Sequence, residues 1–326
     1  MALHRMVHVG RGCSAKTVPE CSPVPIRKRV VCCLHRDEFL PEGVGPLFPE
    51  HQPLSALREA MDRQTVLTGL ALRCSSQGEL AIDLGGYEGI IPREDAVHPA
   101  VSGAQREIAV LYRVGLPVSC TVTKIEVDGG GKPHLTLSRR AAQEQAMSWL
   151  LEYARPGVVL PARVTHLEHF GAFVDLGCGF TSLVPLERIS AARISHPADR
   201  FAVGQDILVT VTAVDAPACR IYLSHKELLG TWLENAAGFA PGDTVTGIVR
   251  SIQDYGIFIE LTPNLSGLAE WKQGLAPGDS VSVYIKSIRP ESRKIKLQVI
   301  RRLGRARVPS PLRYFITDGT TENWVY

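Results

Sequence analysis

One passage occurs twice in this chain, at a spacing of 85 residues. Residues 162–176 read ARVTHLEHFGAFVDL and residues 247–261 read GIVRSIQDYGIFIEL, and the two align without a gap. A Pro-Gly pair precedes each copy, and a Gly-led block follows each, GQDILVTVTAVD and GDSVSVYIKSIR. Recurrence at a fixed period indicates a repeated module. The chain is therefore expected to fold as small domains in tandem rather than around one large core.

A weaker third copy precedes these two. Every copy has the same order of short strand-like segments, with a glycine opening the fourth segment and the fifth reading HLTLS, RIYLS or KIKLQ. Five short strands per module without β-α-β alternation predict small antiparallel barrels. Helical spacing is found at residues 53–64, 141–154 and 225–239, and the last two segments are expected to link the barrels.

These patterns divide the chain into five parts. They are an N-terminal extension that is disordered or mis-annotated (1–45), a degenerate repeat (65–140), two full repeats (156–228 and 241–303) and a C-terminal tail (304–326).

Composition limits the class of protein. The eight cysteines include no Cys-x-x-Cys pair, which fits free thiols in a reducing cytoplasm better than disulfides or a zinc site. No apolar run approaches the ~18–20 residues of a membrane-spanning helix. We expect a cytoplasmic protein with no metal, no cofactor and no membrane partner.

Charge is unevenly distributed between the repeats. The net charge is +3, and residues 241–303 hold nine Lys and Arg against six Asp and Glu, whereas residues 156–228 hold six against seven. Binding to duplex DNA through phosphates normally needs a far more basic protein. If the chain binds a nucleic acid, stacking must supply much of the affinity.

Aromatic residues in the repeated passage are candidates for such stacking. Period-2 alternation along AFVDL sends Phe173 and Asp175 to the outside of the barrel, and the same alternation sends Phe258 and Glu260 outward in the other copy.

A second ring precedes each of these by three residues. Strict alternation would place Phe170 and Tyr255 on the opposite face, but a bulge at the following glycine, Gly171 or Gly256, would bring both rings to one side. Two rings on one open face form a platform for unpaired bases, at ~1–3 kcal/mol per stacked base.

The string VTHLEHFGAFVDLGCG…SLVP, followed by VGQDILVTVTAVD…RIYLS, resembles the RNA-binding repeat of the ribosomal protein S1 family. The resemblance covers about 240 of the 326 residues and is weaker in the first repeat. It implies a mainly β protein of three tandem five-stranded oligonucleotide-binding-fold barrels joined by short helical linkers. It also implies that the protein is not an enzyme and binds single-stranded RNA in translation, in association with the small ribosomal subunit.

The resemblance and the pattern together give ten predicted RNA-binding residues. They are Phe170, Phe173, His166, Asp215 and Arg220 in the second repeat, and Tyr255, Phe258, Arg250, Lys286 and Lys294 in the third.

Some positions depart from the family. Pro185 and Glu270 stand where the family often has histidine, and Arg289 stands at the acidic position of the third repeat. The first repeat has no aromatic pair, and residues 65–140 resemble repeats that dock on protein, here the small ribosomal subunit. An accessory role in RNA decay or processing, and a protein-docking scaffold, remain alternative functions.

Overall fold

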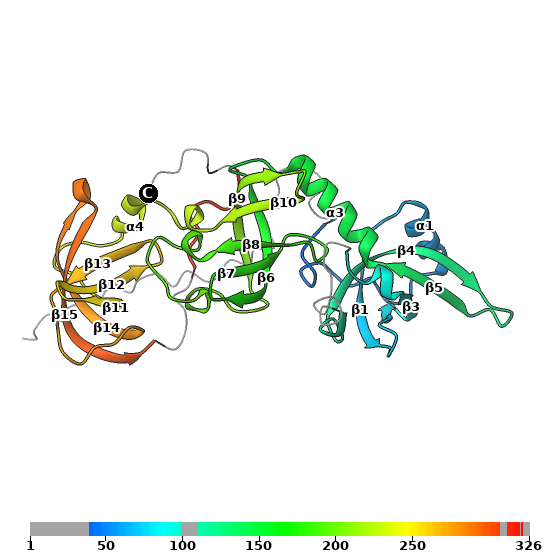
Figure 1. Cartoon of the computed structure of the whole chain (residues 1–326), viewed down its shortest axis with the longest axis horizontal. Coiled ribbons are helices and arrows are strands. Elements are labelled where there is room, and N and C mark those ends of the chain that lie inside the picture. Colours follow the sequence, from blue (N-terminus) through cyan, green and yellow to red (C-terminus); the bar gives the residue numbers. More distant parts are fainter. Residues whose placement is uncertain (1–38, 99–109, 307–311, 320, 322–326) are drawn as a thin grey trace, which may run out of the picture. The chain divides into compact units, whose positions relative to one another are not determined.

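Three groups of five short strands follow one another along the chain (Figure 1). The structure is a computed structural model that describes residues 39–98, 110–306, 312–319 and 321. The predicted N-terminal extension up to residue 38 lies outside the described residues. Residues 39–45, at the end of that extension, are described and contact the barrels.

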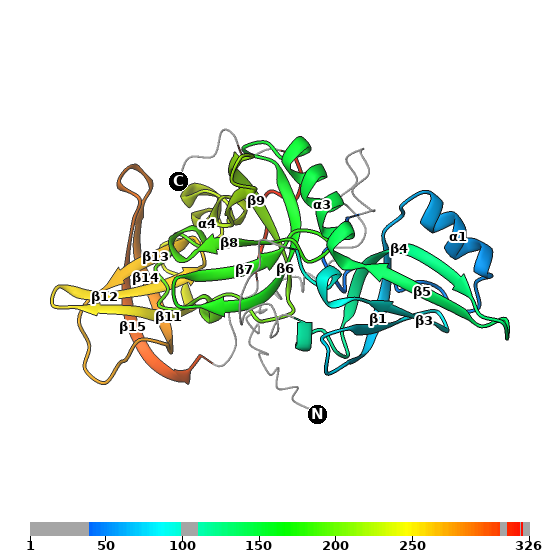
Figure 2. The ribbon, with the colours of Figure 1, turned by 45° about the vertical axis from the view of Figure 1, so that its right-hand side comes forward.

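The first barrel is closed, in the order β1-β2-β3-β5-β4. Figure 2 labels four of these strands, β1, β3, β4 and β5. Its strands are β1 (Leu67–Cys74), β2 (Leu80–Leu84), β3 (Tyr87–Ile91), β4 (Pro117–Val127) and β5 (Pro133–Ser138). Alternation fills its interior, because Val118, Cys120 and Val122 on β4 point inward and are fully buried.

The second barrel has the same strand order but is open between two strands. Its strands are β6 (Val159–Glu168), β7 (Gly171–Asp175), β8 (Thr181–Pro185), β9 (Asp206–Asp215) and β10 (Arg220–Ser224). Where the β8–β10 ladder is missing, the Ser182 hydroxyl donates a hydrogen bond to the Ile221 carbonyl. A side chain thus bridges the gap between the two strands.

The third barrel is closed, in the order β11-β12-β13-β15-β14. Its strands are β11 (Thr244–Gln253), β12 (Gly256–Thr262), β13 (Leu265–Ala269), β14 (Asp279–Arg289) and β15 (Lys294–Arg305). Its interior includes Ile257 and Ile259, which are fully buried, as the alternation predicts.

Short helices connect and cover the strands. They are α1 (Leu54–Asp62), α3 (Arg139–Tyr153), α4 (Trp232–Ala236) and the 3-10 turns η2 (Arg93–Asp95), η3 (Leu186–Arg188), η4 (Pro197–Asp199), η5 (Lys226–Leu229) and η6 (Pro290–Ser292). The Ser138 hydroxyl caps α3 by accepting from the Ala141 N–H. Thr231 and Glu234 form a capping box on α4. Both predicted linkers therefore contain a helix.

The three repeated glycines have one structural role. Gly115, Gly204 and Gly278 have φ angles of 81°, 82° and 89°. Each N–H donates to a carbonyl of its barrel's first strand, that of Ala71, Val164 or Val249. A left-handed backbone before the fourth strand favours glycine, which explains its recurrence.

The barrel topology is that of the oligonucleotide-binding fold, a five-stranded Greek-key barrel that is closed or partly open. The prediction of a mainly β protein with three such barrels and short helical linkers is confirmed.

Candidate nucleic-acid interface

The first ring of each pair lies in a hairpin turn. Glu168 pairs with Gly171, so His169 and Phe170 form the two-residue turn between β6 and β7. Tyr255 occupies the corresponding turn between β11 and β12. The prediction of a bulge at the glycine was wrong. Phe170 and Tyr255 lie in the turn, where the alternation of side chains along a strand does not apply.

The bulge lies one strand earlier. The β6–β7 register shifts between Val164 and His166, and the hydroxyl of the extra residue, Thr165, donates to the Phe173 carbonyl at 3.1 Å. In the third barrel the shift falls between Val249 and Ser251.

Glycine follows the turn because the third strand of the barrel comes close. A Cβ atom at Gly171 would lie 2.5 Å from the Val184 carbonyl oxygen, and one at Gly256 would lie 2.6 Å from that of Ala269. Gly256 also has a φ of 151°. A larger residue would push the hairpin away from its neighbour, so the Phe-Gly-x-Phe pattern has a steric basis.

Both ring pairs are accessible from outside the barrels. Phe170 is 45 % exposed and its ring meets Phe173 edge to face at 6.0 Å. Tyr255 is 70 % exposed and meets Phe258 edge to face at 6.1 Å. We call these two pairs the aromatic platforms. Phe173 and Phe258 are half-buried, and none of the four rings belongs to a barrel interior.

Cross-strand neighbours extend each platform. His166 lies opposite Phe173 and stacks on it, with ring centroids 4.4 Å apart and an angle of 15° between the planes. In the third barrel, pairing places Ser251, Phe258, Leu268 and Lys296 in one row across the outer face.

Tyr222 and Lys296 were missed at the sequence level. Tyr222 is 47 % exposed on β10, and Lys296 is exposed at the corresponding position of β15. The signal was present in RIYLS and KIKLQ, since alternation sends the middle residue outward when the apolar residues on either side are buried.

The predicted charged residues lie at the hairpin end of the same sheets. Arg220 is paired across the strands with Asp215, and Lys294 with Arg289. Arg220, Lys294 and Arg289 are exposed, and Asp215 is half-buried.

Lys286 has a carboxylate partner. Its ammonium group lies 2.9 Å from Glu270, and this hydrogen bond lowers the pKa of the Glu270 carboxyl group. Part of its charge is therefore neutralised on the protein.

Arg250 is not brought to the platform. Its side chain is 9 % exposed and forms ion pairs with Glu260 at 2.6 Å and with Asp199 at 3.3 Å. The sequence showed a cation on a barrel strand but not the carboxylates that enclose it, so its assignment to the RNA contacts needs correction.

Asp175 and Glu260 point out of their barrels as predicted. They are nevertheless only 2 % and 1 % exposed, because other residues cover them. Glu42 covers Asp175 by donating its N–H to the carboxylate, and Arg200 covers Glu260.

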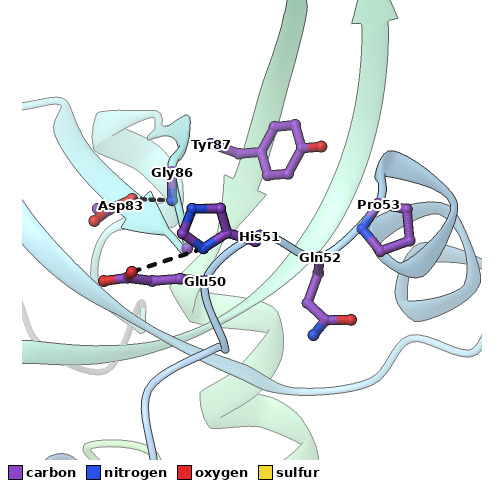
Figure 3. A pocket seen from close by; sticks show the side chains of 8 residues that line it. Glu50, His51, Gln52, Pro53, Asp83, Gly86 and Tyr87 are labelled. Carbon is purple, nitrogen blue, oxygen red and sulfur yellow. Dashed lines mark hydrogen bonds and ion pairs between the residues drawn. The ribbon is translucent and has the colours of Figure 1, made fainter.

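The first barrel has a different surface. A pocket lies beside its β2–β3 turn and is lined by residues that include Glu50, His51, Asp83 and Tyr87 (Figure 3). The Asp83 carboxylate accepts a hydrogen bond from the Gly86 N–H at 2.8 Å, which holds the turn (Figure 3). No aromatic pair was detected on this barrel among the described residues.

The described residues contain neither a metal-ligand cluster nor a membrane-spanning helix. They hold no cluster of three or more His, Cys, Asp or Glu side chains suited to a metal ion. None of their helices has the length and hydrophobicity needed to cross a membrane.

Comparisons with known proteins point to one family. Residues 153–226 match the S1 RNA binding domain. The small ribosomal subunit protein bS1 of Leuconostoc lactis is 34 % identical over 203 residues, which is 60 % of this chain and 45 % of that protein. The bS1 homolog of Bacillus subtilis is 33 % identical over 202 residues, 60 % of this chain and 50 % of that protein. The chain thus spans half or less of the length of these curated relatives.

Among solved structures, a Streptococcus pneumoniae multidomain protein with nucleic acid binding domains matches 73 % of each chain, at 16 % identity and a TM-score of 0.24. GSP13 of Bacillus subtilis is 29 % identical over 27 % of this chain and 60 % of that one, with a TM-score of 0.21. On the sequence matches, residues 153–226 form an S1 RNA binding domain, and 60 % of the chain is similar to bS1 ribosomal proteins.

Proposed function

We propose that this protein binds single-stranded RNA through its second and third barrels and acts in translation, without catalysing a reaction. The observation that carries the proposal is the recurrence of one geometry. Phe170 with Phe173 and Tyr255 with Phe258 meet edge to face at nearly equal distances, at the hairpin between the first two strands of each barrel.

Unpaired bases suit these platforms because every base has a π face that can stack on an exposed ring. Recognition by stacking tolerates many sequences, whereas hydrogen bonds to base edges would select among them. Exposed cations on the last strands of the same barrels, such as Arg220 and Lys294, supply contacts to phosphates. The expected ligand is therefore an unstructured messenger RNA segment of mixed sequence.

The first barrel has a separate role in this proposal. Residues 65–140 form its strands but contribute no aromatic pair among the described residues, and its outer turn carries polar residues around Asp83. The curated relatives are named small ribosomal subunit proteins. We assign this barrel to docking on the small ribosomal subunit in the cytoplasm.

The test of RNA binding compares the full chain with a variant lacking all four rings. Phe170→Ala, Phe173→Ala, Tyr255→Ala and Phe258→Ala together are expected to weaken binding of a fluorescein-labelled oligouridine by tenfold or more, since each lost stack costs ~1–3 kcal/mol. Fluorescence anisotropy measures the affinity. Tyr112→Ala is the matched control, because Tyr112 is exposed outside both platforms.

Equal affinity of the four-ring variant and wild type would contradict the proposal. The docking role is tested separately, by crosslinking the full chain to purified small ribosomal subunits and mapping the crosslinked peptides. Crosslinks to ribosomal proteins are expected within residues 65–140; crosslinks confined to the two other barrels would contradict this assignment.

A further inference from the structure

The two platforms differ in the residues that surround their rings. Cross-strand pairing places His166 beside Phe173 in the second barrel and Ser251 beside Phe258 in the third. The last strands also differ. Two residues after the exposed cation that begins the strand, β10 of the second barrel has Tyr222 and β15 of the third barrel has Lys296.

The second barrel therefore presents an aromatic face. His166 stacks on Phe173, Phe170 meets Phe173 edge to face, and the exposed Tyr222 ring lies on β10 of the same barrel. The cation of this face, Arg220, is paired across the strands with Asp215, a residue of opposite charge whose carboxylate accepts the Ala218 N–H. One cation thus lies next to one acid at this position of the strand pair.

The third barrel presents a cationic face. Lys294 and Arg289 are paired directly across β15 and β14, and both are exposed. Like charges in this position destabilise a sheet. Neither side chain has an ion-pair partner among the residues that the structure describes, and Lys296 adds a third exposed cation two residues from Lys294. Of the acidic groups near these cations, Glu270 is bound by Lys286, and Glu291 lies in the turn between Arg289 and Lys294.

We propose that the two barrels hold different parts of the RNA: the second barrel binds bases by stacking, and the third barrel binds chiefly the phosphate backbone through Arg289, Lys294 and Lys296. This inference rests on the proposed RNA binding and adds a division of the ligand between the barrels. The overall charges agree, with nine cationic against six acidic residues in 241–303 and six against seven in 156–228.

Salt dependence separates the two kinds of contact. Each phosphate contact to a single strand releases counterions and contributes about 0.7 to the slope of log affinity against log salt concentration. Stacking on a neutral ring releases few ions. Loss of cations in the third barrel should therefore flatten the slope, whereas loss of rings in the second should lower affinity at every salt concentration with little change of slope.

The experiment measures the affinity of the full chain for a labelled oligouridine over a range of salt concentrations. The triple variant Arg289→Gln, Lys294→Gln and Lys296→Gln is expected to reduce the slope by about 2. The double variant Phe173→Ala and Tyr222→Ala is expected to keep the wild-type slope while losing tenfold or more in affinity.

Arg220→Gln is the matched control for a single cation. Arg220 occupies the position of Lys294 but faces Asp215, so its loss should change the slope less than Lys294→Gln does. A second probe is an abasic oligonucleotide of the same length, which retains phosphates and lacks bases. The double aromatic variant should bind it as wild type does, and the triple cation variant should bind it more weakly.

Two results would overturn the inference. One is a slope that falls equally in the aromatic and cationic variants; the other is an unchanged slope in the triple cation variant. Failure of the proposed function looks different, because wild type itself would then not bind the oligouridine, or the four-ring variant would bind it equally well.

Discussion

His225 shows how burial of one ring links stability to pH. It is fully buried, with Nδ1 2.7 Å from the Ile189 carbonyl oxygen and Nε2 3.2 Å from the Tyr314 hydroxyl. Burial lowers the pKa of His225 from 6.5 to about 4, and the positive charge of Arg200 adds to the shift. The imidazole is therefore neutral in the folded protein at neutral pH.

We predict that His225 makes the protein less stable as pH falls. Between pH 6.5 and 4 the unfolded chain takes up a proton at this residue and the folded chain does not, so the free energy of unfolding decreases, by up to about 3 kcal/mol. Urea unfolding of wild type and His225→Gln over this range measures the difference. His225→Gln should lack this contribution to the fall in the free energy of unfolding. His51→Gln, at an exposed histidine, should retain it.

The comparison with the variant is needed because Asp175 acts in the opposite sense. Burial and the nearby Glu42 carboxylate raise the pKa of Asp175 to about 7. Between pH 4 and 7 the folded protein therefore binds more protons at Asp175 than the unfolded chain does, and the free energy of unfolding falls as pH rises. A pH dependence identical in wild type and His225→Gln would contradict the assignment to His225.

At the scale of elements, the segment before α1 ties the first two barrels to each other. Glu42 accepts hydrogen bonds from Arg139 at 2.8 and 2.9 Å and from Arg113, and it donates its N–H to Asp175 at 2.8 Å. Although burial opposes ionisation, Arg139 and Arg113 hold the pKa of Glu42 below its ordinary value. The Glu42 carboxylate is therefore negatively charged, and the guanidinium groups of Arg139 and Arg113 balance that charge.

Glu42→Gln is predicted to lower the free energy of unfolding by about 3–5 kcal/mol, because it removes the main countercharge of the buried Arg139. Glu59→Gln is the matched control, since Glu59 pairs with Arg63 on the exposed face of α1. That change should cost no more than about 0.5 kcal/mol. Similar losses in both variants, measured by denaturant unfolding, would show that Glu42 is no more than a surface charge.

Strand alternation predicted the barrels well and their contacts poorly. It placed Val174, Ile257 and Ile259 inside and Phe173 outside, because inside and outside are decided within one strand. It could not show that Asp175 and Glu260, also outside, are covered by residues 133 and 60 positions away. Contacts of that range have no local signature.

The same limit explains the errors at the site. Phe170 was correctly paired with Phe173 but for the wrong reason, since the hairpin turn and its register were not visible in the sequence. Tyr222 could have been found, because its neighbours Ile221 and Leu223 already indicated which side faces out. The chemistry of the platform was predictable, whereas its exact neighbours were not.

At the scale of the whole molecule, the second and third barrels share a buried interface. Arg200, which follows η4, binds Glu260 on β12, and both side chains are almost fully buried. The Asn264 amide donates to the carbonyls of Lys226 and Gly230 at 2.7 and 2.8 Å, and its carbonyl oxygen accepts from the Ala191 N–H at 2.9 Å.

Two platforms on one chain predict a dependence of affinity on RNA length. Once an oligouridine is bound to one platform, the other meets it at a high effective concentration, so an RNA long enough for both should bind up to 10²–10⁴-fold more tightly than one long enough for a single barrel. Lengths of about six and about 20 nucleotides suit one and two such barrels, since one barrel of this fold covers ~4–16 nucleotides. Phe170→Ala with Phe173→Ala should abolish most of this gain and leave the affinity for the short RNA at the third barrel. The longer RNA also has more positions at which one platform can bind, which raises its affinity on statistical grounds. The variant with a single platform measures this statistical gain alone. A length gain as large in the variant as in wild type would show that the barrels act independently.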